Sequence, residues 1–300
     1  MIATVVYFLT LEPTVSWWDC GEYISTAYKL QVGHPPGAPL FQMIGRFFSL
    51  FAGGDVTKVA MMVNVMSAIC SALTIVFLFW TITMLARKVW MKEGEDAPWA
   101  NKIGVLLAGF VGAVAYIFTE SFWFNAVEGE VYAMSSFFTA VTFWAILKWE
   151  QVADDPMSYR WFILIAFLIG LSIGVHLLNL LCVPAIVYVV YFKKWKKTSF
   201  WGFVLAGVIS LVLLWFLNMF LVPQIINMAG KTELFFVNTL GAPFNLGSIV
   251  YFAVIIGLII WGLWYTAKRG KVIWNTTILA FMFILIGYSS FFMLIIRANT

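Results

Sequence analysis

The chain of 300 residues is 63% hydrophobic and only 11% charged, with a net charge of +4. Soluble globular domains carry about 25% charged residues, so this composition excludes a soluble domain and indicates an integral membrane protein. The basic residues gather between long apolar runs, as topology signals do, and therefore give no sign of nucleic-acid binding.

Nine apolar segments, the first of them incomplete, are predicted to cross the membrane as helices. They are 1–11, 59–86, 103–119, 131–147, 161–175, 177–192, 200–222, 249–267 and 272–296. The fold class expected is all-α and polytopic, with residues 1–300 forming a single transmembrane domain. The short first segment and the early stop after the last one predict a fragment of a longer chain.

The run 161–192 holds 32 residues, no charged group and one histidine. It is too long for one ordinary span, so we predict a tight hairpin that turns near His176. One long tilted helix is the alternative, but it would reverse every later segment.

With the hairpin, thirteen of the eighteen Lys and Arg residues fall in four loops at one end of the bundle. The positive-inside rule assigns that end to the cytoplasm. Polar and ionisable residues gather at the opposite, non-cytoplasmic end, where we expect the functional site: Asp19, Glu22, His34, Glu120, Glu128, Glu130, His176 and Arg297.

The first external loop, residues 13–53, is predicted to hold two interfacial helices joined by a rigid His34-Pro35-Pro36 turn. Asp19 and Glu22 are three residues apart and would share one face of the first helix, with Lys29 two turns further on. The structural alternative is that Asp19 caps this helix and Glu22 occupies its third position.

Glu128 and Glu130 are predicted to open the fourth span. The helix dipole would favour them there for structural reasons alone, whereas a wet cavity or a cation would give them a function. On a helix, residues two apart cannot point the same way.

Other candidates have weaker signals. A lone histidine such as His176 serves in a core as readily as in a site, and Arg297, at the outer end of the last span, suits a phosphate. The three cysteines show neither a disulfide pattern nor metal-ligand spacing, and Cys20 is interpreted as a small residue rather than a reactive thiol.

With Asp19 and Glu22 after the first span, then His34-Pro35-Pro36-Gly37 and a surface helix, the chain resembles the GT-C superfamily of membrane glycosyltransferases. It is most similar to the bacterial branch of the protein O-mannosyltransferase-like family, formerly a domain of unknown function. The similar stretches are PTVSWWDCGEYISTAYKLQVGHPPGAPLF, FWFNAVEGEVYAMSSFF, GLSIGVHLLNLL and IIRAN.

The resemblance implies transfer of a sugar, expected to be mannose, from a polyprenyl-phosphate carrier to Ser or Thr hydroxyls of exported proteins. The reaction would invert the anomeric centre, at the periplasmic face of the bacterial cytoplasmic membrane. Family members continue into a large soluble region, which agrees with the expected fragment.

The family's acidic base in the first external loop corresponds here to Asp19, with Glu22 as its partner. Protein O-mannosyltransferases have an adjacent Asp-Glu pair, whereas Cys20 and Gly21 intervene here, so the choice between Asp19 and Glu22 stays open. Further residues are expected to bind the substrates: Arg297, His34, Lys29 and His176 the phosphate, and Glu128 and Glu130 the sugar or acceptor.

No cofactor is expected besides the lipid-linked donor. Carboxylates such as Asp19, Glu128 and Glu130 could hold a divalent ion, but their spacing does not indicate one. The alternative functions are a transporter or flippase of polyprenyl-linked sugars and a structural membrane subunit. Charges at span ends, and no visible internal repeat, weigh against a transporter.

Overall fold

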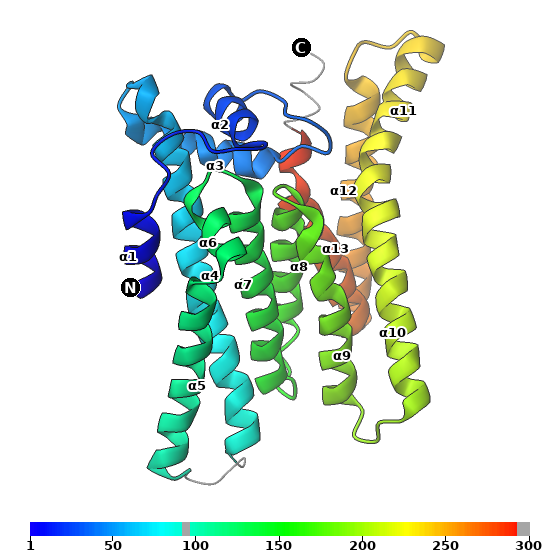
Figure 1. Cartoon of the computed structure of the whole chain (residues 1–300). Coiled ribbons are helices and arrows are strands. Elements are labelled where there is room, and N and C mark those ends of the chain that lie inside the picture. Colours follow the sequence, from blue (N-terminus) through cyan, green and yellow to red (C-terminus); the bar gives the residue numbers. More distant parts are fainter. Residues whose placement is uncertain (92–96, 293–300) are drawn as a thin grey trace.

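The computed structural model describes residues 1–91 and 97–292, and these residues form helices and loops without a strand (Figure 1). Arg297, one of the predicted phosphate ligands, lies outside the described residues. The α-helices are α1 (Ile2–Leu9), α2 (Cys20–Lys29), α3 (Pro39–Ser49), α4 (Val59–Trp90), α5 (Trp99–Ile117), α6 (Glu120–Val127), α7 (Val131–Gln151), α8 (Arg160–Ile173), α9 (Cys182–Lys194), α10 (Phe200–Trp215), α11 (Val222–Leu240), α12 (Leu246–Lys268) and α13 (Val272–Tyr288).

Seven helical stretches of the described chain are long and apolar enough to cross a membrane, so the protein is a polytopic membrane protein. They are Val56–Trp90, Trp99–Ile117, Val131–Gln151, Leu177–Lys194, Phe200–Leu240, Leu246–Lys268 and Val272–Phe292. Each of the nine predicted segments contains a helix, but α1 has 8 residues and α8 has 14, short of the ~20 that span a bilayer. Seven of the described helical stretches therefore qualify as spans by length and composition, and the count of nine stays a prediction.

The predicted hairpin is present. Helix α8 ends at Ile173, the chain turns through Gly174–His176, and a 3₁₀ turn at Leu177–Leu181 leads into α9. The alternative of one long helix through this run is wrong.

The C-terminal ends of α4, α7, α9 and α12 point toward the lower end in Figure 1. The described residues of the basic runs lie at or next to these helix ends, so the prediction that these runs share one end of the bundle is confirmed for the described residues. Helices α2 and α3, the start of α7 and the α8–α9 turn lie at the other end. The predicted loop helices are thus both present, above the bundle.

Helix α4 passes through the middle of the packing and contacts α1, α3, α5, α6 and α7. Helices α8 and α13 approach closely through glycines, as small residues allow in membrane bundles. A Cβ at Gly170 would collide with the Ile284 carbonyl oxygen, and one at Gly287 would stand 2.5 Å from the Leu171 nitrogen. This packing sets the end of α13 beside the α8–α9 turn, where a Cβ on Gly174 would collide with Ser290 Oγ.

The helix that begins with α10 extends beyond the span that hydropathy predicted. Residues 200–240 are continuously helical, with a π-helical turn at Phe216–Leu221 just before Pro223. The predicted spans left 223–248 outside because polar residues interrupt the apolar pattern there. Glu233 connects α11 to the start of α12, since its carboxylate accepts the Asn245 and Ser248 N–H groups at 2.5 and 2.8 Å.

Candidate functional site

The segment before α2 is fixed to the bundle by a buried asparagine. Asn64 of α4 donates from Nδ2 to the carbonyl oxygens of Glu12 and Thr14, at 2.7 and 3.0 Å. The Glu12 N–H in turn donates to the Val127 carbonyl at 3.2 Å. The start of α2 therefore lies beside the α6–α7 connection, which brings together two acidic stretches more than a hundred residues apart in sequence.

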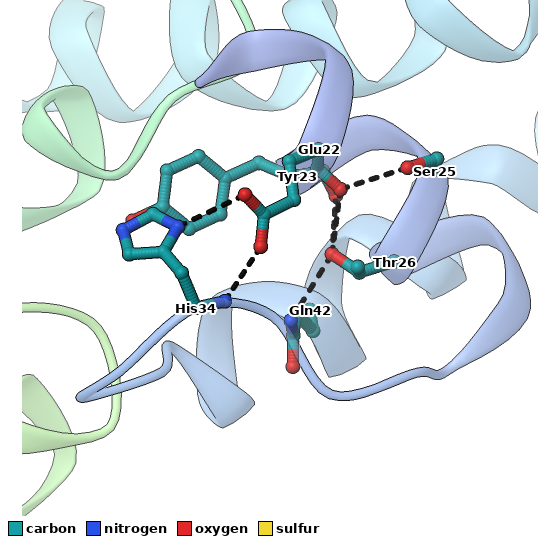
Figure 2. A network of polar contacts seen from close by, with 6 residues as sticks. All are labelled: Glu22, Tyr23, Ser25, Thr26, His34 and Gln42. Atoms are coloured by element: carbon teal, nitrogen blue, oxygen red, sulfur yellow. Dashed lines mark hydrogen bonds and ion pairs between the residues drawn. The ribbon is translucent and has the colours of Figure 1, made fainter.

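Asp19, Glu22 and His34 form the outer cluster, in which the side-chain donor atoms lie within 4.8 Å of one another. Glu22 accepts the His34 backbone N–H at 2.5 Å, and its second oxygen is 3.0 Å from Nδ1 of the His34 ring (Figure 2). Asp19 is exposed at the N-cap position of α2, yet its side chain makes no capping hydrogen bond. The predicted neighbourhood of these three residues is confirmed. Asp19 and Glu22 also occupy the predicted N-cap and third positions of α2, but the capping hydrogen bond from the Asp19 side chain is absent.

Around Glu22, polar contacts join α2 to the loop and to α3 (Figure 2). Thr26 Oγ1 donates to the Glu22 carbonyl at 2.7 Å, and Gln42 Nε2 of α3 donates to Thr26 Oγ1 at 3.1 Å. The rings of Tyr23 and His34 pack with their centroids 5.6 Å apart. The hydrogen bonds from His34 lower the pKa of the Glu22 carboxyl below its usual value. Glu22 is thus charged, and its carboxylate is occupied by the contacts with His34.

Cys20, Glu128 and Glu130 form the inner cluster, whose side-chain donor atoms also lie within 4.8 Å of one another. All three residues are buried, with Cys20 fully enclosed, Glu128 1% exposed and Glu130 8% exposed. Neither carboxylate oxygen of Glu128 has a hydrogen bond of good geometry among the described residues. The side chains of Ser16 and Cys20 nevertheless face this carboxylate and favour its charged form.

Both glutamates point the same way because they precede the helix instead of lying on it. Glu128 has φ −124° and ψ 155°, and Glu130 has φ −129° and ψ 162°, which is extended backbone. In an extended chain, side chains at i and i+2 project to the same face. The expectation drawn from helical spacing is wrong for this reason.

Gly129 lets the extended segment approach α2 and α4. A Cβ at this position would stand 2.9 Å from Asn64 Oδ1, 3.0 Å from Ile24 Cγ1 and 3.1 Å from Val63 Cγ1. Such contacts are closer than a side chain tolerates, so the buried position of the two glutamates depends on glycine here.

Burial and mutual repulsion raise the pKa values of the inner cluster. Desolvation raises the pKa of the Glu130 carboxyl to about 7, and the charges of Glu128 and Asp19 add to this effect. Desolvation also raises the pKa of Glu128. Burial, followed by the two glutamate charges, raises the pKa of the Cys20 thiol far above its usual value. Cys20 is therefore a protonated thiol and not a reactive surface cysteine.

The two clusters meet in a pocket of about 390 Å³, called here the acidic pocket. Its lining combines three carboxylates with an amide and three aromatic rings: Asp19, Glu128, Glu130, Asn125, Trp18, Phe124 and Tyr132. Trp18 is 87% exposed and has φ +61°, a left-handed conformation that bulky residues rarely adopt. The pocket can offer a solvent-accessible carboxylate, two buried ones and aromatic faces.

The remaining predicted residues take other positions. His176 lies at the α8–α9 turn, where its Nδ1 accepts the Leu178 N–H at 3.1 Å and its ring is 5.3 Å from that of Tyr132. Burial lowers the pKa of His176, in agreement with a neutral ring that accepts this hydrogen bond. Lys29 is exposed at the end of α2, and its ammonium makes no hydrogen bond or ion pair with a described residue. Glu120 is exposed at the start of α6.

Sequence reasoning missed Cys20 and the aromatic lining. A cysteine next to an aspartate gave no spacing signal, because its partners come from a different stretch of the chain. Trp18 directly precedes Asp19 in the sequence, and only the fold shows that it borders a pocket.

Known proteins similar to this chain share one description. A family model described as "Protein O-mannosyl-transferase TMEM260 N-terminal domain" matches residues 19–199, beginning at Asp19. The chain is 28% identical over 138 residues to "Protein O-mannosyl-transferase tmem260" of Dictyostelium discoideum, a match over 46% of this chain and 15% of that protein. It is 28% identical over 169 residues to "Protein O-mannosyl-transferase TMEM260" of Mus musculus, a match over 56% of this chain and 21% of that protein. No solved structure matches the chain.

Proposed function

Because this chain belongs to the protein O-mannosyl-transferase TMEM260 N-terminal domain family, we propose that it is a membrane glycosyltransferase that moves a sugar onto protein hydroxyl groups. The names of the two relatives favour mannose as the sugar. The donor proposed is a polyprenyl-phosphate sugar, and the acceptor is a Ser or Thr of an exported protein. The chain matches less than a quarter of each relative, so the activity belongs to this proposal.

The acidic pocket is proposed to work on the non-cytoplasmic side. It lies at the end of the bundle that carries α2 and α3, away from the four basic loops. Basic loops remain in the cytoplasm according to the positive-inside rule. A lipid-linked donor exposed on the other side of the membrane would meet the pocket there.

Asp19 is proposed as the catalytic base, and its contrast with Glu22 carries this assignment. Asp19 is exposed and borders the pocket, whereas the carboxylate of Glu22 is held by two contacts with His34. A base must reach the acceptor hydroxyl at about 2.6–3.2 Å. A carboxylate with a free, solvent-facing side is available for this contact, and Glu22 is better suited to fix the His34 turn.

The reaction is a single displacement. The carboxylate of Asp19 takes the proton of the acceptor hydroxyl as its oxygen forms a bond to the anomeric carbon. The bond from that carbon to the phosphate oxygen breaks, and the polyprenyl phosphate departs with the electron pair. Attack opposite the leaving group inverts the anomeric centre. Lys29, His34, His176 and Arg297 are the proposed phosphate ligands, because the departing phosphate gains charge.

A second pocket suits the carrier lipid. It has a volume of about 480 Å³, a mostly apolar lining and walls from α4, α5, α7 and the turn before α9. Its wall includes Leu178, two residues after His176, so it begins near the proposed phosphate ligands. An isoprenoid tail is the occupant that we propose for this groove.

The test is a transfer assay with the full-length protein in lipid. The donor is polyprenyl-phosphate-mannose with a radiolabelled sugar, the acceptor is an extract of exported proteins, and the variants are Asp19→Asn and the control Asp55→Asn. Asp55 lies in the α3–α4 connection, where it accepts hydrogen bonds from Thr57. We expect label on protein with the wild type and the control, and a 10²–10⁴-fold lower rate with Asp19→Asn.

Two outcomes contradict the proposal. Label that crosses the bilayer but stays on lipid would favour a flippase of polyprenyl-linked sugars. Equal activity of Asp19→Asn and Asp55→Asn would exclude Asp19 as the base.

A further inference from the structure

The inner cluster contains buried hydrogen-bond acceptors with too few donors. Both oxygens of Glu128 and Oδ1 of Asn64 are buried without a hydrogen bond of good geometry among the described residues, although the Ser16 hydroxyl and the Cys20 thiol face the Glu128 carboxylate. Asn64 Oδ1 lies against the backbone at Gly129, between the two glutamates. Buried polar groups are normally satisfied, so several unmatched acceptors in one place indicate that something positively charged or protic belongs there.

Within the described parts of the chain, the protein itself supplies no cation to these acceptors. The ion pairs there involve Glu22, Asp55, Glu150 and Asp154, and none of them reaches Glu128 or Glu130. Removing one of two paired buried charges is costly, and two unpaired buried carboxylates are less favourable still. Metal coordination is one of the few arrangements in which buried carboxylates are stable.

We propose that Cys20, Glu128 and Glu130 bind one divalent cation of the zinc class, and that the Cys20 thiol releases its proton to solvent as its sulfur binds the metal. Their donor atoms lie within 4.8 Å of one another. Zn²⁺ binds thiolate sulfur at about 2.3 Å and carboxylate oxygen at about 2.0–2.2 Å, so two ligands of one ion stand at most about 4.5 Å apart. The cluster needs only a small contraction to reach this size.

The ligand types and the surroundings favour zinc. Zinc accepts sulfur and oxygen ligands together, whereas Mg²⁺ and Ca²⁺ prefer oxygen alone. Three protein ligands leave a fourth position open, and both glutamates border the acidic pocket, from which an ion, a water molecule or a substrate oxygen can approach. The competing arrangement is a pair of carboxyl groups that hold protons and bind no metal.

The test measures metal binding in the absence of any sugar donor, so its result does not depend on the proposed transferase activity. The full-length protein in detergent is stripped with a chelator and titrated with Zn²⁺, Mn²⁺ or Mg²⁺ alone. Retained metal is counted per chain by mass spectrometry after desalting, and the shift in the thermal midpoint is recorded. The variants are Glu128→Gln, Cys20→Ser and the control Glu120→Gln, an exposed glutamate of α6.

We expect about one zinc per wild-type chain and a higher thermal midpoint with zinc than without it. Loss of a group that only orients a metal ligand weakens metal binding about 10–100-fold. Glu128→Gln removes a ligand itself, so it should weaken zinc binding at least as much. Glu120→Gln should bind as the wild type does. Cys20→Ser should lower zinc affinity more than Mn²⁺ affinity, because zinc gains more from sulfur.

The proposal is overturned if the wild type retains none of the three metals, since the carboxyl groups then hold protons only. It is also overturned if Glu128→Gln binds zinc as tightly as Glu120→Gln does. Glu128→Gln removes a buried charge and keeps the side-chain shape, which favours folding. If this variant still fails to fold, Cys20→Ser decides: unchanged zinc affinity in Cys20→Ser contradicts the proposed ligand set.

Discussion

The outer and inner clusters begin with neighbouring residues, Asp19 and Cys20, yet their environments are opposite. Asp19, Glu22 and His34 lie at the surface, and a glutamate there is paired with a histidine across a turn. Cys20, Glu128 and Glu130 lie below them, buried and without a described counter-charge. The two clusters diverge at the start of α2. Asp19 precedes the helix and faces solvent, whereas Cys20 is its first residue and faces α4 and α7.

This difference in exposure suits the two clusters to different functions at the acidic pocket, proton exchange for the outer one and ion binding for the inner one. A group that exchanges protons with a substrate needs access to it, which the exposed Asp19 of the outer cluster has. Groups that hold an ion need enclosure and fixed geometry, which the inner cluster has. Substitutions in each cluster test this division, and the largest effect is expected for catalysis.

Within the outer cluster, Asp19→Asn and Glu22→Gln should differ strongly in transfer rate. In Glu22→Gln the new amide oxygen can still accept the His34 N–H, so the turn is kept, whereas the amide introduced by Asp19→Asn cannot take a proton. We expect a 10²–10⁴-fold loss for Asp19→Asn and a smaller one for Glu22→Gln. The measurement is the initial rate of label transfer at saturating donor. A greater loss in Glu22→Gln would reverse the roles of the two carboxylates.

An intermediate effect is expected from Gly129→Ala, which should disturb the inner cluster alone. The added methyl group would stand 2.9–3.1 Å from Asn64, Ile24 and Val63. Overpacking of this kind costs about 1–3 kcal/mol of unfolding free energy. Denaturant unfolding in detergent measures the change.

The matched control is Gly257→Ala in α12, because a Cβ there meets nothing within 4 Å. Alanine is the better helix former by up to about 1 kcal/mol, so this variant should be neutral or slightly more stable. Equal destabilisation by both substitutions would show that the fit around Gly129 has no special importance.

The smallest effect is expected for His34→Ala in the outer cluster. The side chains of His34 and Glu22 are 42% and 39% exposed, and exposed ion pairs contribute about 0–1 kcal/mol. The free energy of unfolding should therefore change by less than about 1 kcal/mol, as measured by the same denaturant unfolding. A loss as large as that of Gly129→Ala would mean that the His34 turn supports the fold and not only the site.

The sequence was sufficient to predict the long apolar helices, the two helices of the first external loop, the hairpin at His176 and the gathering of polar residues at one end. Those features follow from long-range hydropathy and from charge counts, which are properties of whole segments. The number of spans stays a prediction, because α8, which is mostly apolar after Arg160, has only 14 residues before its turn. Helix α11 was missed because its polar residues interrupt the apolar pattern, although the helix continues directly from α10.

The detail of the site depended on a few backbone angles that composition does not encode. Glu128 and Glu130 were placed on a helix, whereas two extended residues before the helix bring them to the same side. The position of Cys20 beside the two glutamates depends on the contact between the start of α2 and the α6–α7 connection, and Asn64 holds the segment before α2 in place there. A single sequence contains no record of such contacts between distant stretches.

Trp18 adopts a backbone conformation that costs an L-residue about 1–2 kcal/mol relative to glycine. Folding thus tolerates a local penalty at the rim of the acidic pocket, and the result is an indole ring that stays exposed to water. A glycine at this position would avoid the penalty but would leave the rim without a ring. The tryptophan therefore gives the rim of the acidic pocket a flat aromatic surface that a glycine could not provide.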